Sequence, residues 1–129
     1  MAEPRFLTFD EVLYLHDESL VRFGGSSGIR DKGRVESALG AAENTYWYGR
    51  GGEFEIGAAY ACHLAESPAF LDGNKRTGAA AAIMFLTLNG VIFPMDDGSV
   101  YRAMIEIANR KLDKQGLATV LRVLAGKLN

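Results

Sequence analysis

Residues 75–88 read Lys-Arg-Thr-Gly-Ala-Ala-Ala-Ala-Ile-Met-Phe-Leu-Thr-Leu and include the longest apolar run of the chain, from Gly78 to Leu88. The run is apolar on nearly every side, which is typical of a helix buried in a protein core. It is far shorter than the roughly 20 apolar residues that a membrane-spanning helix needs. We therefore expect a central core helix from about Lys75 to Leu88.

Apolar residues at helical spacing predict further helices on both sides of this one. Thr8 and Glu11 form a capping-box pair at the start of the first helix, and Gly24 and Gly25 end it. The other expected helices run from Asp31 to a break at Tyr48, from Glu53 to about Glu66, from about Val100 to Ala108, and from Leu117 to Leu128. The sequence therefore predicts an all-α fold, with residues 1–129 in a single domain.

Composition narrows the classes of function. The 129 residues are 48% hydrophobic, and 14 basic against 16 acidic side chains give a formal charge of −2. This balance disfavours direct nucleic-acid binding and a membrane surface as partner. Acidic residues in the first twenty positions disfavour a signal peptide, and a single cysteine, Cys62, excludes an internal disulfide. We expect a cytoplasmic protein.

The connector before the core helix, Phe70-Leu71-Asp72-Gly73-Asn74, leads into two cations, Lys75 and Arg76. Cations are unfavourable in the first turn of a helix, where the helix dipole is positive, so a negative group is expected to compensate them. Backbone amides at Gly73 and Asn74, together with the two cations, are suited to phosphate oxygens. Asp72 is a hard oxygen ligand suited to a magnesium ion that bridges phosphates. A capped turn followed by a solvated pair of cations is the non-functional interpretation.

The same residues resemble a family. The stretch from Phe70 to Arg76 resembles the death-on-curing (Doc) branch of the Fic/Doc proteins, whose signature is His-x-Phe-x-Asp-x-Asn-Lys-Arg. The resemblance extends over about residues 7–125, and further matching stretches are His16-Asp17, Phe23-Gly24-Gly25, Gly28-Ile29-Arg30-Asp31, Glu36-Ser37-Ala38-Leu39 and the end of the core helix up to Asn89-Gly90. It implies about six helices around the buried central one.

What this resemblance implies is a toxin of a bacterial toxin-antitoxin pair. Its partners would be a Phd-like antitoxin peptide helix and a protein substrate, a threonine of elongation factor Tu in the Doc branch. The reaction would be phosphoryl transfer from ATP with Mg²⁺. Asp72 would hold the magnesium ion, and Gly73, Asn74, Lys75 and Arg76 would contact the phosphates.

Three positions distinguish this chain from patterns of the family: one departs from the Doc signature and two from the Fic signature. The histidine that acts as base should occupy position 68, where this chain has Pro68, which cannot accept a proton. General-base assistance is worth ~10²–10⁴ in rate, so we expect an impaired phosphotransferase. The AMP-transferring Fic branch has Gly where this chain has Lys75, and a second Arg where it has Ala79. AMP transfer is therefore a weaker alternative, beside an inactive module that binds an antitoxin or another peptide.

Other reactive side chains favour structural interpretations. His16 lies in the apolar stripe of the first helix, and His63 shares a helix face with Ile56 and Tyr60. Both are expected to be structural, with His63 in the core or at an interface. Cys62 is expected to be buried. Arg50, in a glycine-rich break, is either exposed or a flap over the site.

Overall fold

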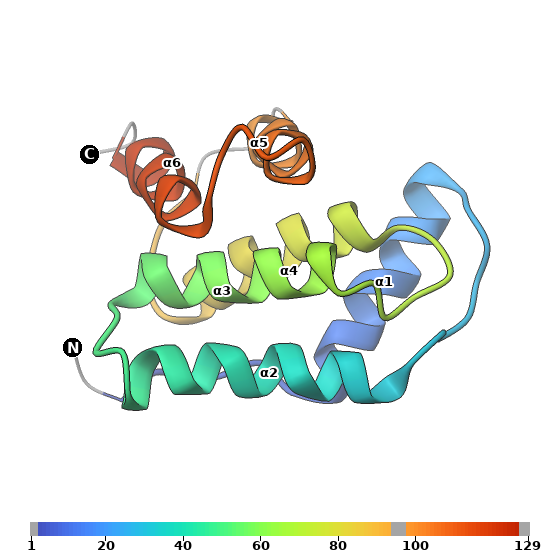
Figure 1. Ribbon diagram of the computed structural model, residues 1–129, viewed down its shortest axis with the longest axis horizontal. Coiled ribbons are helices and arrows are strands. Elements are labelled where there is room, and N and C mark those ends of the chain that lie inside the picture. The colour runs from blue at the N-terminus through green and yellow to red at the C-terminus, as the bar shows by residue number, and fades with distance from the viewer. Residues whose placement is uncertain (1–2, 94–97, 127–129) are drawn as a thin grey trace.

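The computed structural model describes residues 3–93 and 98–126. These residues form six α-helices, whose arrangement is drawn in Figure 1. In chain order they are α1 (Phe9–Phe23), α2 (Lys32–Trp47), α3 (Glu53–Glu66), α4 (Asn74–Leu88), α5 (Ser99–Ala108) and α6 (Lys114–Gly126). The all-α prediction is confirmed, and the described residues contain one isolated β-bridge but no strand. Leu128, expected in the last helix, lies outside the described residues.

The helix ends follow from the local sequence. The Thr8 hydroxyl accepts a hydrogen bond from the Glu11 amide at 3.1 Å, and the Glu11 carboxylate accepts one from the Thr8 amide at 2.9 Å. This is the predicted capping box at the start of α1. The carboxylate of Asp31 caps α2 by accepting from the Gly33 amide at 3.0 Å. The predicted starts of these two helices are therefore confirmed.

Two helices, α3 and α4, share the centre of the bundle. In Figure 1 they lie side by side, with α2 on one side of them and α5 and α6 on the other. The sequence predicted α4 alone as the central helix. However, α3 packs against four helices (α2, α4, α5 and α6), whereas α4 packs against three (α1, α3 and α5). The reason is that α3 carries small residues beyond its apolar stripe, so several of its faces are buried at once; the buried set is Ile56, Gly57, Ala58, Ala59, Tyr60, Ala61, Cys62 and Leu64.

The two central helices approach each other closely at Gly78. A Cβ atom on this glycine would lie 2.8 Å from the carbonyl oxygen of Ala61, which is helix backbone and cannot move away alone. We expect Gly78→Ala to lower the free energy of unfolding by about 1–3 kcal/mol, measured by urea denaturation. Gly40 in α2 has open space around it, so Gly40→Ala is the matched control and should be neutral or stabilising. Equal effects of the two changes would contradict this packing.

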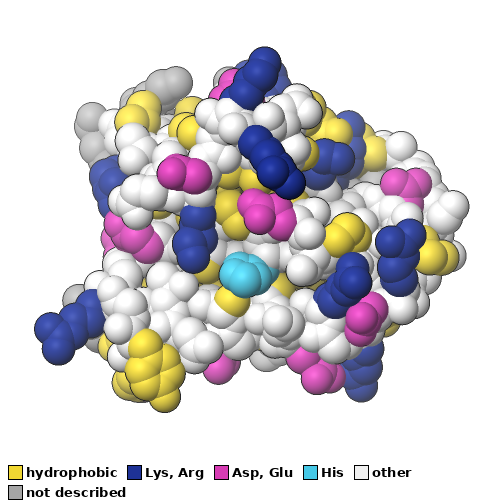
Figure 2. All heavy atoms as spheres, viewed as in Figure 1, with side chains coloured by type: hydrophobic (Ala, Val, Ile, Leu, Met, Phe, Trp, Pro, Cys, Tyr) yellow, Lys and Arg dark blue, Asp and Glu magenta, His cyan; other side chains and the backbone are white. Residues whose placement is uncertain are grey.

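In the described part of the chain, none of the helices has the length and apolar character needed to span a bilayer. Figure 2 shows one face of the molecule, on which basic and acidic side chains are interspersed. A mixed surface of this kind has no broad field of one sign.

Candidate functional site

A cavity of about 410 Å³ lies where α3 ends and α4 begins. It brings together most of the residues that the sequence singled out. Its walls come from the end of α1 and the glycines after it, the last turn of α3, the 67–73 connector, the first turn of α4 and the start of α5. The residues that line it are Phe23, Gly24, Gly25, Ala65, Pro68, Leu71, Asp72, Gly73, Asn74, Lys75, Arg76 and Tyr101.

The connector is held in place by the loop between α1 and α2. The carbonyl oxygen of Ala69 accepts hydrogen bonds from the amides of Arg30 at 2.7 Å and Asp31 at 3.0 Å. The Leu71 amide donates to the carbonyl oxygen of Gly28 at 3.2 Å. From the sequence, Gly24 and Gly25 were expected only to end the first helix. This loop in fact fixes the path of the chain that carries the site.

His16, a buried residue of α1, supports the connector through contacts with Phe70 and Asp72. Its side chain is 2% exposed, and its ring stacks on Phe70 with centroids 3.8 Å apart and planes 9° apart. Its Nε2 lies 2.8 Å from the backbone carbonyl oxygen of Asp72. Because a carbonyl can only accept, Nε2 carries the proton in this bond. His16 therefore has the structural role expected from the sequence.

Asn74 closes the connector on itself. Its side-chain carbonyl accepts from the Phe70 amide at 3.1 Å, and its NH₂ group donates to the Phe70 carbonyl at 3.0 Å. The family resemblance implied that this residue contacts phosphate. The structure shows that its side chain shapes the turn, and its backbone amide is the group left for an anion.

Asp72 lies at the mouth of the cavity and is exposed. One carboxylate oxygen accepts from the Gly73 amide at 2.9 Å, and the other from the Ser26 amide at 3.3 Å. The expectation of a free Gly73 amide is therefore wrong, because Asp72 itself takes that donor. Glycine is favoured at position 25 nearby, where φ is 118°, and a Cβ there would also displace the Asp72 carboxylate, whose Oδ2 atom would lie 2.8 Å away.

The first turn of α4 provides donors for an anion. Gly73 precedes it with φ of 79°, in the left-handed region, and gives no side-chain cap. The first helical hydrogen bond runs from the Thr77 amide to the Gly73 carbonyl at 2.9 Å. The amides of Asn74, Lys75 and Arg76 consequently have no acceptor within the helix. With the exposed Lys75 ammonium beside them, they form a positive helix end facing the cavity.

Arg76 is held between two aromatic rings. Its guanidinium carbon lies 3.7 Å from the ring centroid of Phe23 and 4.2 Å from that of Tyr101. Stacking uses the faces of the guanidinium and leaves its N–H groups, which lie at its edge, able to donate. No local pattern in the sequence predicts this contact, because the rings come from the end of α1 and the start of α5.

Pro68 lines the same cavity, and its carbonyl oxygen accepts from the Arg34 guanidinium at 3.2 Å. The titratable side chains that line this cavity are Asp72, Lys75, Arg76 and Tyr101. None of them is a histidine, and the buried His16 is bound to a backbone carbonyl beneath the connector. The position expected to supply the base is thus inside the site but has no proton acceptor.

Other sequence candidates lie elsewhere. Cys62 is buried, as expected, and burial raises the pKa of its thiol to about 12. His63 is half-buried and faces a second cavity rather than the core, which corrects part of the expectation for it. Arg50 is exposed at the opposite end of α3, so the flap interpretation is wrong.

Comparison with known proteins identifies the family. The family model described as "Fic/DOC family" matches residues 6–86, which contain α1 to α3, the connector and most of α4. The chain belongs to the Fic/Doc family. One relative of this Fic/Doc protein is "Protein kinase doc" of Escherichia phage P1, 32% identical over 124 residues, covering 95% of this chain and 97% of the relative.

A second relative of this Fic/Doc protein is "Toxin Doc" of Mycolicibacterium smegmatis (strain ATCC 700084 / mc(2)155). It is 37% identical over 108 residues, covering 78% of this chain and 81% of the relative. Both relatives carry the name of the Doc branch that the connector sequence resembles. The expected membership is therefore confirmed.

Proposed function

We propose that this protein is a Doc-type toxin whose site binds Mg²⁺-ATP and transfers the γ-phosphoryl group to a protein threonine, with the transfer step impaired at Pro68. The observation that supports it best is the single cavity that joins Pro68, Asp72 and the positive start of α4. The name of the phage P1 relative, a protein kinase, agrees with this class of reaction. By resemblance, the threonine belongs to elongation factor Tu.

The residues present fit a magnesium ion that is shared with phosphates. The described residues contain no group of three or more side chains able to hold a metal ion alone. Mg²⁺ in phosphotransferases is commonly held by one or two carboxylates together with substrate phosphates. Each Asp72 oxygen accepts one amide and has a further lone pair. Asp72 would hold the ion, which would neutralise phosphate charge when bound.

The other groups of the site bind and orient. The amides of Asn74, Lys75 and Arg76 and the Lys75 ammonium can take phosphate oxygens at the start of α4. Phosphoryl transfer depends mainly on positioning and charge stabilisation, which these groups supply. The proton of the target hydroxyl has no histidine to receive it at position 68.

We expect the two rings around Arg76 to preorganise its guanidinium for phosphate. Each ring contributes on the order of 0.5–1 kcal/mol, so Tyr101→Leu should weaken Mg²⁺-ATP binding about two- to fivefold in calorimetry. Tyr101→Phe keeps the ring and should bind as the unchanged protein does. If Tyr101→Phe loses as much affinity as Tyr101→Leu, ring stacking is not the cause.

The toxin role implies an antitoxin, which the resemblance describes as a Phd-like peptide helix. The name "Toxin Doc" of the mycobacterial relative agrees with such a pair. The proposed activity requires the cytoplasm, where ATP and elongation factor Tu are present.

A second candidate function is an inactive module that binds a peptide. Two observations favour it: Pro68 removes the base, and Trp47 and Tyr48 are 54% and 84% exposed at the end of α2. Exposed aromatic side chains of this kind are typical of surfaces that receive a partner.

The position of a radioactive label tests the proposed reaction. Excess protein is incubated with elongation factor Tu and ATP labelled on either the α or the γ phosphate. We expect slow labelling from γ only. Labelling from α would support AMP transfer. Peptide binding without nucleotide binding in calorimetry would favour the inactive module.

A further inference from the structure

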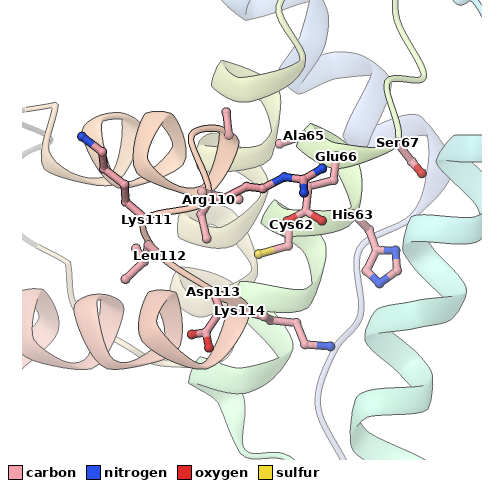
Figure 3. Close-up of a pocket in the computed structure, with 12 residues that line it drawn as sticks. Cys62, His63, Ala65, Glu66, Ser67, Arg110, Lys111, Leu112, Asp113 and Lys114 are labelled. Atoms are coloured by element: carbon pink, nitrogen blue, oxygen red, sulfur yellow. The ribbon is translucent and has the colours of Figure 1, made fainter.

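A second and larger cavity, of about 1070 Å³, lies on the other side of the end of α3. Figure 3 shows it between the last turns of α3, which carry Cys62, His63 and Glu66, and the segment that leads from α5 into α6. Ala65 lines both this cavity and the one at the start of α4. We refer to it as the α3–α6 cavity. The linings of the two cavities therefore share one residue in the last turn of α3, three positions before Pro68.

Exposed basic side chains predominate around the α3–α6 cavity. Arg110, Lys111 and Lys114 line it and take part in none of the ion pairs found among residues 3–93 and 98–126. The carboxylate of Asp113 is already engaged, because it accepts from the Gly116 amide at 2.7 Å. Glu66 is the other acidic side chain of the lining. The lining thus carries three cations against two carboxylates, an excess of one positive charge, and one of the two carboxylates, Asp113, is turned toward the Gly116 amide.

His63 adds a polar group without a further charge. It is half-buried on the α3 side of the cavity. Burial, assisted by the Lys114 ammonium, lowers the pKa of its imidazole. At neutral pH it is therefore uncharged, and it can accept or donate a hydrogen bond.

Arg110 occupies a strained backbone position. Its φ is 58°, in the left-handed region where glycine is favoured. The position is the residue after the C-cap of α5: Arg110 donates to the Ile107 carbonyl at 3.1 Å, and Lys111 donates to the Glu106 carbonyl at 2.9 Å. This is the pattern of a Schellman motif, which glycine most often completes.

We propose that the α3–α6 cavity binds an acidic segment of the protein acceptor, and this proposal rests on the proposed phosphotransferase function. Charge complementarity argues for an acidic partner, since Arg110, Lys111 and Lys114 are exposed and unpaired among the described residues. Proximity to the first cavity argues for the acceptor, because Ala65 lines both cavities and the neighbouring residues Ser67 and Pro68 line one each. An acceptor chain that delivers a hydroxyl beside Pro68 would therefore have the α3–α6 cavity within reach of its flanking residues.

Binding of an acidic peptide tests the cavity without any enzymatic activity. The probe is a fluorescein-labelled hexaglutamate peptide, followed by anisotropy at low salt. We expect Arg110→Gly and Lys114→Gln each to weaken binding about fivefold, the factor that corresponds to the loss of one charged contact.

Arg50→Gly is the matched control. Arg50 is also an exposed arginine in the left-handed region, with φ of 53°, but it lies at the opposite end of α3. Both glycine variants relieve similar strain and remove one charge, so both should raise Tm by a few degrees. Only Arg110→Gly should lose peptide affinity. Equal peptide affinity of the two variants would overturn the proposal.

Two further results separate this proposal from the proposed function. In a Pro68→His background, Arg110→Gly should raise the KM for elongation factor Tu about fivefold and leave the Kd for Mg²⁺-ATP unchanged. An absence of any transfer in that background would contradict the proposed function. The peptide titration would still show whether the α3–α6 cavity binds an acidic segment. Binding of inorganic phosphate that is lost in Arg110→Gly, with no binding of the peptide, would identify a small-anion site and overturn the proposal.

Discussion

Replacing Pro68 with histidine is expected to raise the rate of phosphoryl transfer to elongation factor Tu by ~10²–10⁴. Pro68 lines the cavity that holds Asp72 and Lys75, so a histidine there would lie beside the bound phosphates. It would take the proton of the target hydroxyl. The residues that line this cavity include no histidine that could do so now. The measurement is the initial rate of γ-label transfer under saturating Mg²⁺-ATP.

Pro68→Ala is the matched control for this change. It removes the proline ring and supplies no base, while the position 68 carbonyl can still accept from Arg34. We expect no gain in rate from the alanine. A similar gain with alanine and histidine would show that relief of the ring, rather than base catalysis, limits the present protein.

Lys75→Ala should weaken Mg²⁺-ATP binding about tenfold or more in calorimetry. The ammonium is exposed beside the unpaired amides at the start of α4, and a charge-assisted hydrogen bond to phosphate is worth about 1.5–3 kcal/mol. Because the side chain is exposed, the variant should fold normally. Lys32→Ala, at the start of α2, removes an exposed lysine outside this cavity and should leave affinity unchanged.

Asp72→Asn tests the contribution of the metal ion to nucleotide binding separately from that of the basic side chains. The amide oxygen of asparagine can still accept from a backbone amide, but the charge that favours Mg²⁺ is lost. We expect ATP affinity in this variant to lose its dependence on Mg²⁺. If Lys75→Ala and Asp72→Asn both bind Mg²⁺-ATP as the unchanged protein does, these two residues do not form the nucleotide site.

Local signals explain why the helices could be predicted. The capping box of Thr8 and Glu11, the Asp31 cap and the glycines at positions 24 and 25 each act within a few residues. The shared centre of the bundle could not be predicted in this way. Burial of α3 on several faces depends on how closely other helices approach, as at Gly78 and Ala61, and that is a property of the whole fold.

The same distinction holds for the site. The connector and the start of α4 are contiguous in sequence, so their chemistry could be recognised from Asp72 to Arg76. The supports come from far along the chain: His16 bonds to the backbone of a residue 56 positions away, and Tyr101 stacks on Arg76 from another helix. The occupied Gly73 amide was missed because the Asp72 side chain folds back on its neighbour. Such contacts leave no periodic signal in the sequence.

A crystal structure of the protein with magnesium and a non-hydrolysable ATP analogue would test the nucleotide site most directly. We predict phosphate oxygens within hydrogen-bonding distance of the amides of residues 74–76 and of the Lys75 ammonium, with the metal ion on Asp72. An analogue bound elsewhere, or a cavity at the start of α4 that stays free of phosphate at saturating concentrations, would contradict the proposed function.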